Sequence, residues 1–156
     1  MLDVYNVKME IDVTADQLFQ IANPVALLGW IVLIAGIVFR RPQWRDIYAG
    51  QVFPTALSLV YTCLIIFFWA KAEGGFDTLP NVQKLFTYPW AALGGWVHYL
   101  AFDLFVGAHI SRRLMEEGIS RLFLIVLLPL TFLFGPIGYF GFQLTRLAFR
   151  KVSATS

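Results

Sequence analysis

One aspartate, one tyrosine and one histidine stand close together in an apolar stretch of this chain, and such side chains can exchange protons. Asp103 falls near the middle of residues 91–110, four residues after Tyr99 and five after His98. An ionised carboxylate at the centre of a bilayer costs at least ~2.5 kcal/mol on insertion scales. We therefore expect Asp103 to face the interior of a helix bundle and to be paired, hydrogen-bonded or protonated. Asp103 either has a functional role or forms a structural contact with a polar group on another helix.

The helical period sorts the neighbours of Asp103 onto two faces. At about 100° per residue, Trp96 and Tyr99 share the face of Asp103, so a hydrogen bond between the phenol and the carboxylate is within reach. The roughly opposite face holds four ring side chains: His98, Phe102, Phe105 and His109. The two histidines are three turns apart, which separates their backbones by about 16 Å. One helix therefore cannot place both histidines on one metal ion.

The inventory of ligands and motifs excludes several classes of membrane enzyme. The chain has 2 histidines, whereas a membrane di-iron hydroxylase needs multiple histidine boxes and two bis-histidine haems need a histidine for every axial position. HExxH, CxxC, GxSxG and Walker sequences do not occur. The single cysteine, Cys63, cannot form an intramolecular disulfide. We therefore expect no metal site and no required cofactor.

The elements that must position these residues are apolar helices of membrane-spanning length. Of the 156 residues, 58% are hydrophobic and 14% are charged, against roughly 25% charged in a soluble domain. Basic residues cluster at the ends of the apolar stretches, and no groove for nucleic acid is indicated. The expected fold is all-α: a polytopic membrane protein, residues 1–156 as a single membrane domain, built as a four-transmembrane-helix bundle. The predicted spans are about 15–39, 48–70, 91–110 and 122–149.

Capping signals mark two helix starts. Thr14 and Gln17 form a capping box at the start of the first span. Residues 76–90 are too polar to cross a bilayer, yet their apolar residues have helical spacing. This pattern predicts a short interfacial helix between the second and third spans, capped near Thr78 or Asn81.

Two further patterns lie on the second and fourth spans. The second span carries a polar stripe: Tyr48, Gln51, Thr55, Ser58 and Thr62. The stripe either holds helices together through hydroxyl groups or forms one wall of a polar cavity facing Asp103. In the fourth span, Gly135-Pro136 predicts a kink or tilt, and Pro136 frees a backbone carbonyl one turn earlier.

Charge bears on the orientation in the membrane. The Lys and Arg residues are divided equally, 6 and 6, between the two sides of the predicted four-span bundle. Acidic residues before the first span favour the first loop in the cytoplasm, and both termini would then lie outside. The acidic amino-terminal segment is unlike a signal or transit peptide. We expect a bacterial inner or intracytoplasmic membrane.

Three sequence strings resemble the ABA4-like membrane protein family. They are HYLAFDLFVG at residues 98–107, LTFLFGPIG at residues 130–138 and LFQIAN at residues 18–23. The likeness extends in order from about Leu18 to Leu144. The plant member for which the family is named is required to form neoxanthin from violaxanthin, so the resemblance implies carotenoid or other isoprenoid chemistry. The chain departs from the expected pattern after Gly107, where Ala108-His109 replace an arginine followed by an aromatic residue.

Converting an epoxide to an allenic alcohol is a redox-neutral isomerisation that needs a base and an acid but no metal or nucleotide. The candidate catalytic residues are Asp103, Tyr99 and His98. The candidate substrate-binding residues are Trp96, Phe102, Phe105, Asn23, Gly135 and Pro136. Two other functions remain open. One is a non-catalytic subunit that binds carotenoid or lipid and docks to a larger photosynthetic or respiratory membrane complex, or to further copies of itself. The other is a proton-coupled transporter using the same buried acid.

Overall fold

The computed structural model describes residues 13–154, with side chains described as far as Phe149. All regular elements among these residues are helical. The first helix, α1, is Ala15–Val38; a π-helical segment, η1 (Trp44–Val52), continues into α2 (Phe53–Phe68) and the 3₁₀ turn η2 (Trp69–Lys71). The remaining elements are α3 (Leu79–Thr87), α4 (Pro89–Glu116), η3 (Arg121–Phe123), α5 (Leu124–Phe134) and α6 (Pro136–Ala154).

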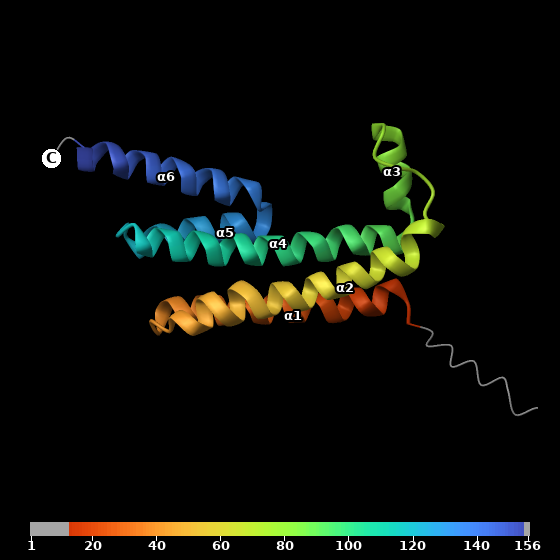
Figure 1. Cartoon of the computed structure of the whole chain (residues 1–156), viewed down its shortest axis with the longest axis horizontal. Helices are drawn as coiled ribbons and strands as arrows, with labels where there is room; N and C mark the ends of the chain where they lie inside the picture. The colour runs from red at the N-terminus through yellow and green to blue at the C-terminus, as the bar shows by residue number, and fades with distance from the viewer. Residues whose placement is uncertain (1–12, 155–156) are drawn as a thin grey trace, which may run out of the picture.

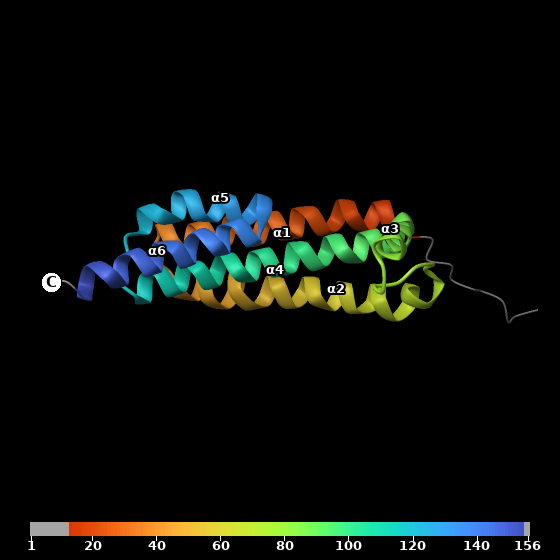
Figure 2. The same cartoon turned by 90° about the horizontal axis from the view of Figure 1, so that it is seen from above.

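Three long helices run along the long axis of the molecule. By length and composition, Ala15–Val38, Trp44–Lys71 and Pro89–Glu116 could each cross a membrane. They correspond to α1, to α2 with its flanking turns, and to α4, which run side by side in both views (Figures 1 and 2). Many large hydrophobic side chains on their outer faces are exposed, as expected of helices surrounded by lipid. The all-α expectation is confirmed, and the apolar helices indicate a membrane protein.

The predicted fourth span folds back on itself. Residues 122–149 were expected to form one kinked helix, but α5 ends at Phe134 and α6 begins at Pro136. A Cβ atom added to Gly138 would collide with Thr131, and one added to Gly141 would lie 3.1 Å from Leu127. In a continuous helix, positions 127 and 141 would be about 21 Å apart. A single helix over 122–149 is therefore wrong, and the count of four spans is not confirmed.

The reversal has an identifiable backbone cause. Pro136 has no N–H to continue the hydrogen-bond ladder of α5. Gly135 adopts φ 41° and ψ −87°, a conformation that residues other than glycine rarely adopt. The result is a hairpin of α5 and α6 that reaches only about halfway along α4 (Figures 1 and 2).

Two predicted caps are present. The Gln17 N–H donates to Thr14 Oγ1 at 3.2 Å and the Thr14 N–H donates to Gln17 Oε1 at 3.0 Å, which confirms the capping box. The helix α3 lies within residues 76–90, and the Asn81 N–H donates to Thr78 Oγ1 at 3.4 Å. This helix stands away from the bundle beside the start of α4 (Figure 1).

The buried core is organised around α4. One cluster joins Leu104 of α4 to Trp30 of α1, and a second joins Val97 of α4 to Leu57 of α2. Gly107 allows α1 to approach closely, because a Cβ atom there would lie 2.6 Å from the Trp30 ring. Close packing of this kind is a main source of stability between membrane helices.

The two ends of the bundle differ. The turn between α1 and η1, the turn between α4 and η3, and the end of α6 lie at one end (Figures 1 and 2). The start of α1 and α3 lie at the other end. The described chain therefore starts and finishes at opposite ends of the bundle, whereas four full spans would have placed both termini at the same end.

Candidate functional site

Asp103 lies at the centre of α4, and its side chain is buried. The residue is 7% exposed, and its Oδ2 atom has no hydrogen-bond partner among the described residues. A buried polar atom without a partner is unusual, because its desolvation is not compensated. Such an atom needs an explanation, and a catalytic role is one.

The tip of the α5–α6 hairpin packs directly on this carboxyl group. A Cβ atom added to Gly135 would lie 2.5 Å from Asp103 Oδ1. Gly135 is thus required for two reasons, its positive φ and its contact with the acid. The hairpin brings a backbone turn, without a side chain, against Asp103.

Tyr99 links the same helix to the break between α5 and α6. Its hydroxyl group donates to the Phe132 carbonyl oxygen at 3.1 Å. In a regular helix that carbonyl would accept from the residue four positions later, which is Pro136 and has no N–H. The Tyr99 hydroxyl also lies beside the Asp103 carboxyl group. The expected proximity of phenol and carboxyl is therefore present, although the phenol donates to a backbone carbonyl.

An aromatic strip leads away from Asp103 along α4. Trp96 stacks with Tyr99 at a ring separation of 5.4 Å, and its Nε1–H donates to Asn23 Oδ1 of α1 at 2.7 Å. Phe19 lies 5.8 Å from Trp96, at the edge of a cavity that both residues line. Because Trp96 is 40% exposed, the aromatic strip is open to the surroundings of the bundle.

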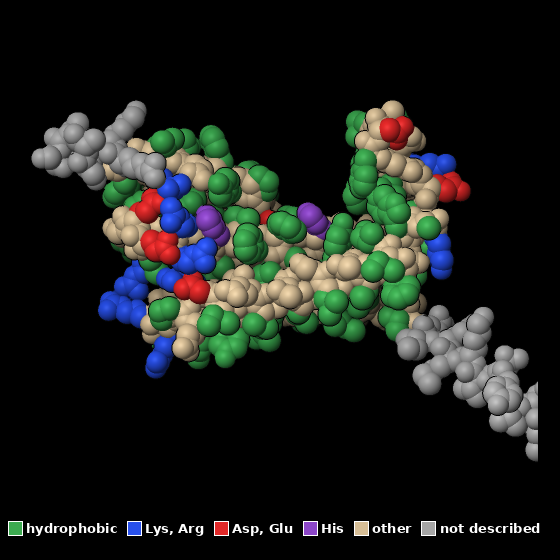
Figure 3. Space-filling model, in the orientation of Figure 1, with side chains coloured by type: hydrophobic (Ala, Val, Ile, Leu, Met, Phe, Trp, Pro, Cys, Tyr) green, Lys and Arg blue, Asp and Glu red, His purple; other side chains and the backbone are tan. Residues whose placement is uncertain are grey.

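The short hairpin leaves the first half of α4 uncovered. Figure 3 shows the surface hollowed between the α5–α6 hairpin and α3, with hydrophobic side chains along this recess. Asp103 meets the hairpin at Gly135, so the acid lies at the edge of the recess.

His98 belongs to a different group of side chains. It stacks on Phe102 at 4.6 Å and lies 5.4 Å from the ring of Tyr61 on α2. Five residues along a helix correspond to about 7.5 Å and a rotation of about 140°, which separates His98 from Asp103. The structure therefore joins Asp103 and Tyr99 but directs His98 towards α2.

Phe102 and Phe105 line a groove between α4 and α2. The groove has a volume of about 350 Å³, and its other wall includes Gln51 of η1 and Thr55 and Ser58 of α2. These residues belong to the polar stripe predicted on the second span. These three residues of the stripe face this groove, whose lining does not include Asp103.

The sequence did not single out Phe132, whose carbonyl oxygen receives the Tyr99 hydroxyl. The signal was present in the position of Pro136, four residues later, but the donor could not be identified because it lies on another helix. Among the described residues, no group of three or more His, Cys, Asp or Glu side chains could hold a metal ion. The chemistry available is proton transfer by a buried carboxyl group and a phenol, beside a stacking surface for a flat molecule.

A comparison with known families gives one match. The model of the ABA4-like family, described as ABA DEFICIENT 4-like, matches residues 17–142. The matched region covers most of the chain and contains Asn23, Asp103 and Gly135. The expected family resemblance is confirmed. Neither the curated proteins nor the solved structures contain a match to the chain.

Proposed function

The chain belongs to the ABA4-like family, and from this premise we propose that it is a membrane isomerase acting on a carotenoid or a related isoprenoid lipid. The observation that carries the proposal is the buried Asp103, whose Oδ2 atom lacks a partner beside Tyr99. Both groups lie where the aromatic strip meets the hairpin tip. A conjugated chain stacked along Trp96 and Tyr99 would place its end group near the acid.

The proposed reaction converts an epoxide to an allenic alcohol without any change in formula. Asp103 takes a proton from the polyene carbon next to the epoxide, and the electrons of that C–H bond form the new double bond. The adjacent C–O bond of the epoxide breaks, and its electrons remain on oxygen. Tyr99 gives its hydroxyl proton to this oxygen and recovers a proton from Asp103. No oxidant or reductant is consumed.

The surroundings favour such proton transfer. A site that excludes water strengthens electrostatic interactions and protects reactive intermediates. Asp103 is held between α4 and the hairpin, and the bond to the Phe132 carbonyl keeps the Tyr99 hydroxyl beside it. In the proposed step the hydroxyl turns from this carbonyl to the epoxide oxygen before it gives up its proton. General acid and base groups positioned in this way typically contribute a factor of about 10²–10⁴ in rate.

The proposal includes a membrane topology. At the end that carries the first loop, the described chain has nine Lys and Arg residues: Arg40, Arg41, Arg45, Arg112, Arg113, Arg121, Arg146, Arg150 and Lys151. At the opposite end it has Lys71 and Lys84. Excess Lys and Arg favours the cytoplasmic side. We therefore place the first loop and the hairpin base in the cytoplasm of a bacterial inner membrane, and α3 at the opposite interface.

The test is carotenoid analysis in a bacterial host that makes an epoxide carotenoid and expresses this chain. The expected product has the same mass as its precursor and a different chromatographic retention. Asp103→Asn should lower product formation at least about 100-fold, while Asp77→Asn, a matched change at an exposed position, should leave it unchanged. Full product formation by folded Asp103→Asn protein would refute catalysis by this carboxyl group.

A second function has its own observation. Gln51 of η1 and Thr55 of α2 are both exposed, where lipid would otherwise meet polar groups. Polar side chains at such positions often join membrane helices of different subunits. This arrangement favours an accessory subunit that docks to a larger membrane complex or to another copy of the chain. Stoichiometric partner subunits after gentle purification, with pigment content unaffected by Asp103→Asn, would support this function over the isomerase.

A further inference from the structure

A basic cavity lies at the loop end of the bundle, away from Asp103. It has a volume of about 510 Å³ and is bounded by the end of α1, the turn after it and the turn before η3. Three arginines line it: Arg40, Arg45 and Arg121. Basic residues gather at this end of the molecule in the space-filling view (Figure 3).

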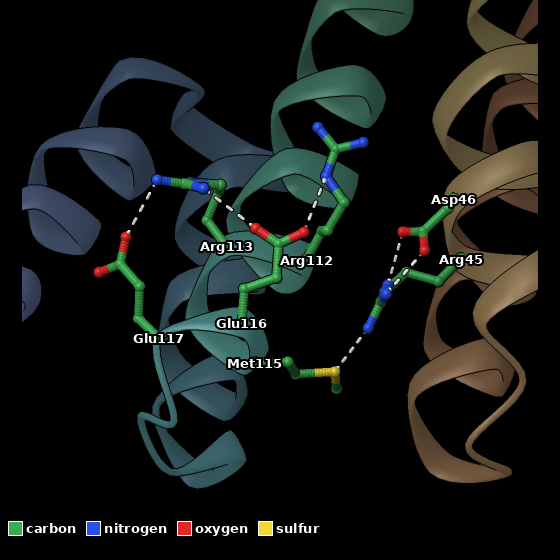
Figure 4. A network of polar contacts seen from close by, with 7 residues as sticks. All are labelled: Arg45, Asp46, Arg112, Arg113, Met115, Glu116 and Glu117. Carbon is green, nitrogen blue, oxygen red and sulfur yellow. Dashed lines mark hydrogen bonds and ion pairs between the residues drawn. The ribbon is translucent and has the colours of Figure 1, made fainter.

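Most arginines at this end have acidic partners. Arg45 pairs with Asp46 at 2.7 Å and also donates to the Met115 sulfur, as Figure 4 shows. Figure 4 also shows the second group of ion pairs, in which Arg112 and Arg113 contact Glu116 and Glu117. The positive charge of these residues is thus compensated within the protein.

Arg40 and Arg121 differ from the arginines shown in Figure 4. Neither forms an ion pair with a residue in the described part of the chain. Arg121 Nη1 donates to the Ile37 carbonyl oxygen at 3.4 Å, which holds the guanidinium group at the mouth of the cavity and leaves its other donors for a ligand. The cavity therefore presents two positive charges that no side chain in it neutralises.

An apolar groove adjoins the basic cavity. It has a volume of about 530 Å³ and runs between α1 and α5, with Ile34 on one side and Ile125 on the other. The basic cavity and the apolar groove share three lining residues: Ile37, Ser120 and Arg121. Ile34 and Ile125 are both exposed, so the groove opens towards the bilayer.

We propose that the basic cavity and the apolar groove together bind one anionic phospholipid of the surrounding bilayer. The phosphate group lies between Arg40 and Arg121, because guanidinium groups bind phosphate through charge-assisted hydrogen bonds. An acyl chain follows the apolar groove along α5. Basic pockets between membrane helices are suited to anionic headgroups, and the adjoining groove distinguishes a lipid from free phosphate.

The test measures the thermal unfolding of the full chain in a neutral detergent with three additives. Phosphatidylglycerol should raise the melting temperature in a concentration-dependent manner, whereas phosphatidylcholine and inorganic phosphate should have little effect. The double variant Arg40→Gln/Arg121→Gln should weaken phosphatidylglycerol binding about 25-fold, taking about fivefold for each cation near an anionic surface. Arg112→Gln removes a charge at the same end but outside the cavity, and should bind normally.

Two single variants keep the test decisive if the double variant is unstable. Arg40→Gln leaves the Arg121 hydrogen bond to Ile37 intact and should weaken binding about fivefold. Ile125→Trp fills the apolar groove and should weaken phosphatidylglycerol binding while both arginines remain. Equal stabilisation by phosphatidylcholine, equal stabilisation by inorganic phosphate, or normal binding by folded Arg40→Gln and Ile125→Trp proteins would each overturn the proposal.

Discussion

Replacing Gly135 with alanine should strongly destabilise the protein, because this glycine is required for both the hairpin turn and its contact with Asp103. The backbone contribution comes from φ 41° and ψ −87°, and holding another residue in such a region costs about 1–3 kcal/mol. The packing contribution comes from the 2.5 Å separation between the added Cβ atom and Asp103 Oδ1. Overpacking of a buried site costs typically about 1–3 kcal/mol. Together they predict a loss of about 2–6 kcal/mol in the free energy of unfolding.

Gly118 provides a matched control for this substitution. It also has a positive φ, 68°, but a Cβ atom there would meet nothing within 4 Å. Gly118→Ala should therefore show only a backbone cost of about 1–2 kcal/mol. A larger loss for Gly135→Ala than for Gly118→Ala is expected, because only Gly135 adds the cost of packing against the acid to that of the backbone.

The assay is equilibrium unfolding in mixed detergent micelles, followed by tryptophan fluorescence. Trp30 is a suitable reporter, because its ring packs edge-on against Phe132 of the hairpin at 5.4 Å. A double-mutant cycle with Asp103→Ala tests the contact itself. Gly135→Ala should cost about 1–3 kcal/mol less when Asp103 is already alanine, because the clash is then absent. The reasoning is refuted if the cost is the same in both backgrounds, or if Gly135→Ala costs no more than Gly118→Ala.

Three further outcomes are expected. Tyr99→Phe removes the donor to the Phe132 carbonyl oxygen and should cost about 1 kcal/mol in the same unfolding assay; an unchanged stability would contradict a net contribution from this hydrogen bond. Lys84 lowers the pKa of Glu73 below its ordinary 4.5, first through a side-chain hydrogen bond and then through its charge, so Lys84→Gln should return that pKa towards 4.5 in an NMR titration. Because the pKa of Glu73 is lowered on folding, the stabilisation from this pair is present above the unfolded-state pKa and is lost as pH falls through the folded-state pKa. If the pKa of Glu73 is the same in Lys84→Gln as in the unsubstituted protein, the pair does not form. Finally, activity reporters fused to the two termini should indicate opposite sides of the membrane, and reporters on the same side would rule out three crossings with a returning hairpin.

The sequence predicted the helical elements well where the signal was local. The capping box of Thr14 and Gln17 depends on residues three positions apart, and it is present. The fourth apolar stretch was interpreted as one kinked helix because hydrophobicity and length do not distinguish a kink from a reversal. The chain reverses at Gly135 through a backbone conformation with positive φ, and the resulting turn packs against Asp103 on α4. Such a contact across sequence-distant segments has no local signature.

The same distinction applies to the candidate site. The proximity of Asp103 and Tyr99 followed from helical spacing alone, as did the separation of His98 on another face. The spacing did not reveal that the Tyr99 hydroxyl donates to Phe132, because its acceptor lies 33 residues away in the chain. The polar stripe on α2 had two alternative orientations, since periodicity identifies a face but not the helix that it faces.

The α5–α6 hairpin also bears on the order of events during synthesis. The ribosome makes α4 before it makes any of the hairpin, so Asp103 is synthesised before the segment that covers it at Gly135. At the centre of a membrane helix, an aspartate opposes insertion by about 2.5–3.5 kcal/mol, and the apolar residues of α4 must offset this cost. Once translated, the hairpin packs its Gly135 turn over the carboxyl group and encloses it. The hairpin, made after α4, thus completes the burial of the acid, and a chain truncated before α5 would lack this cover.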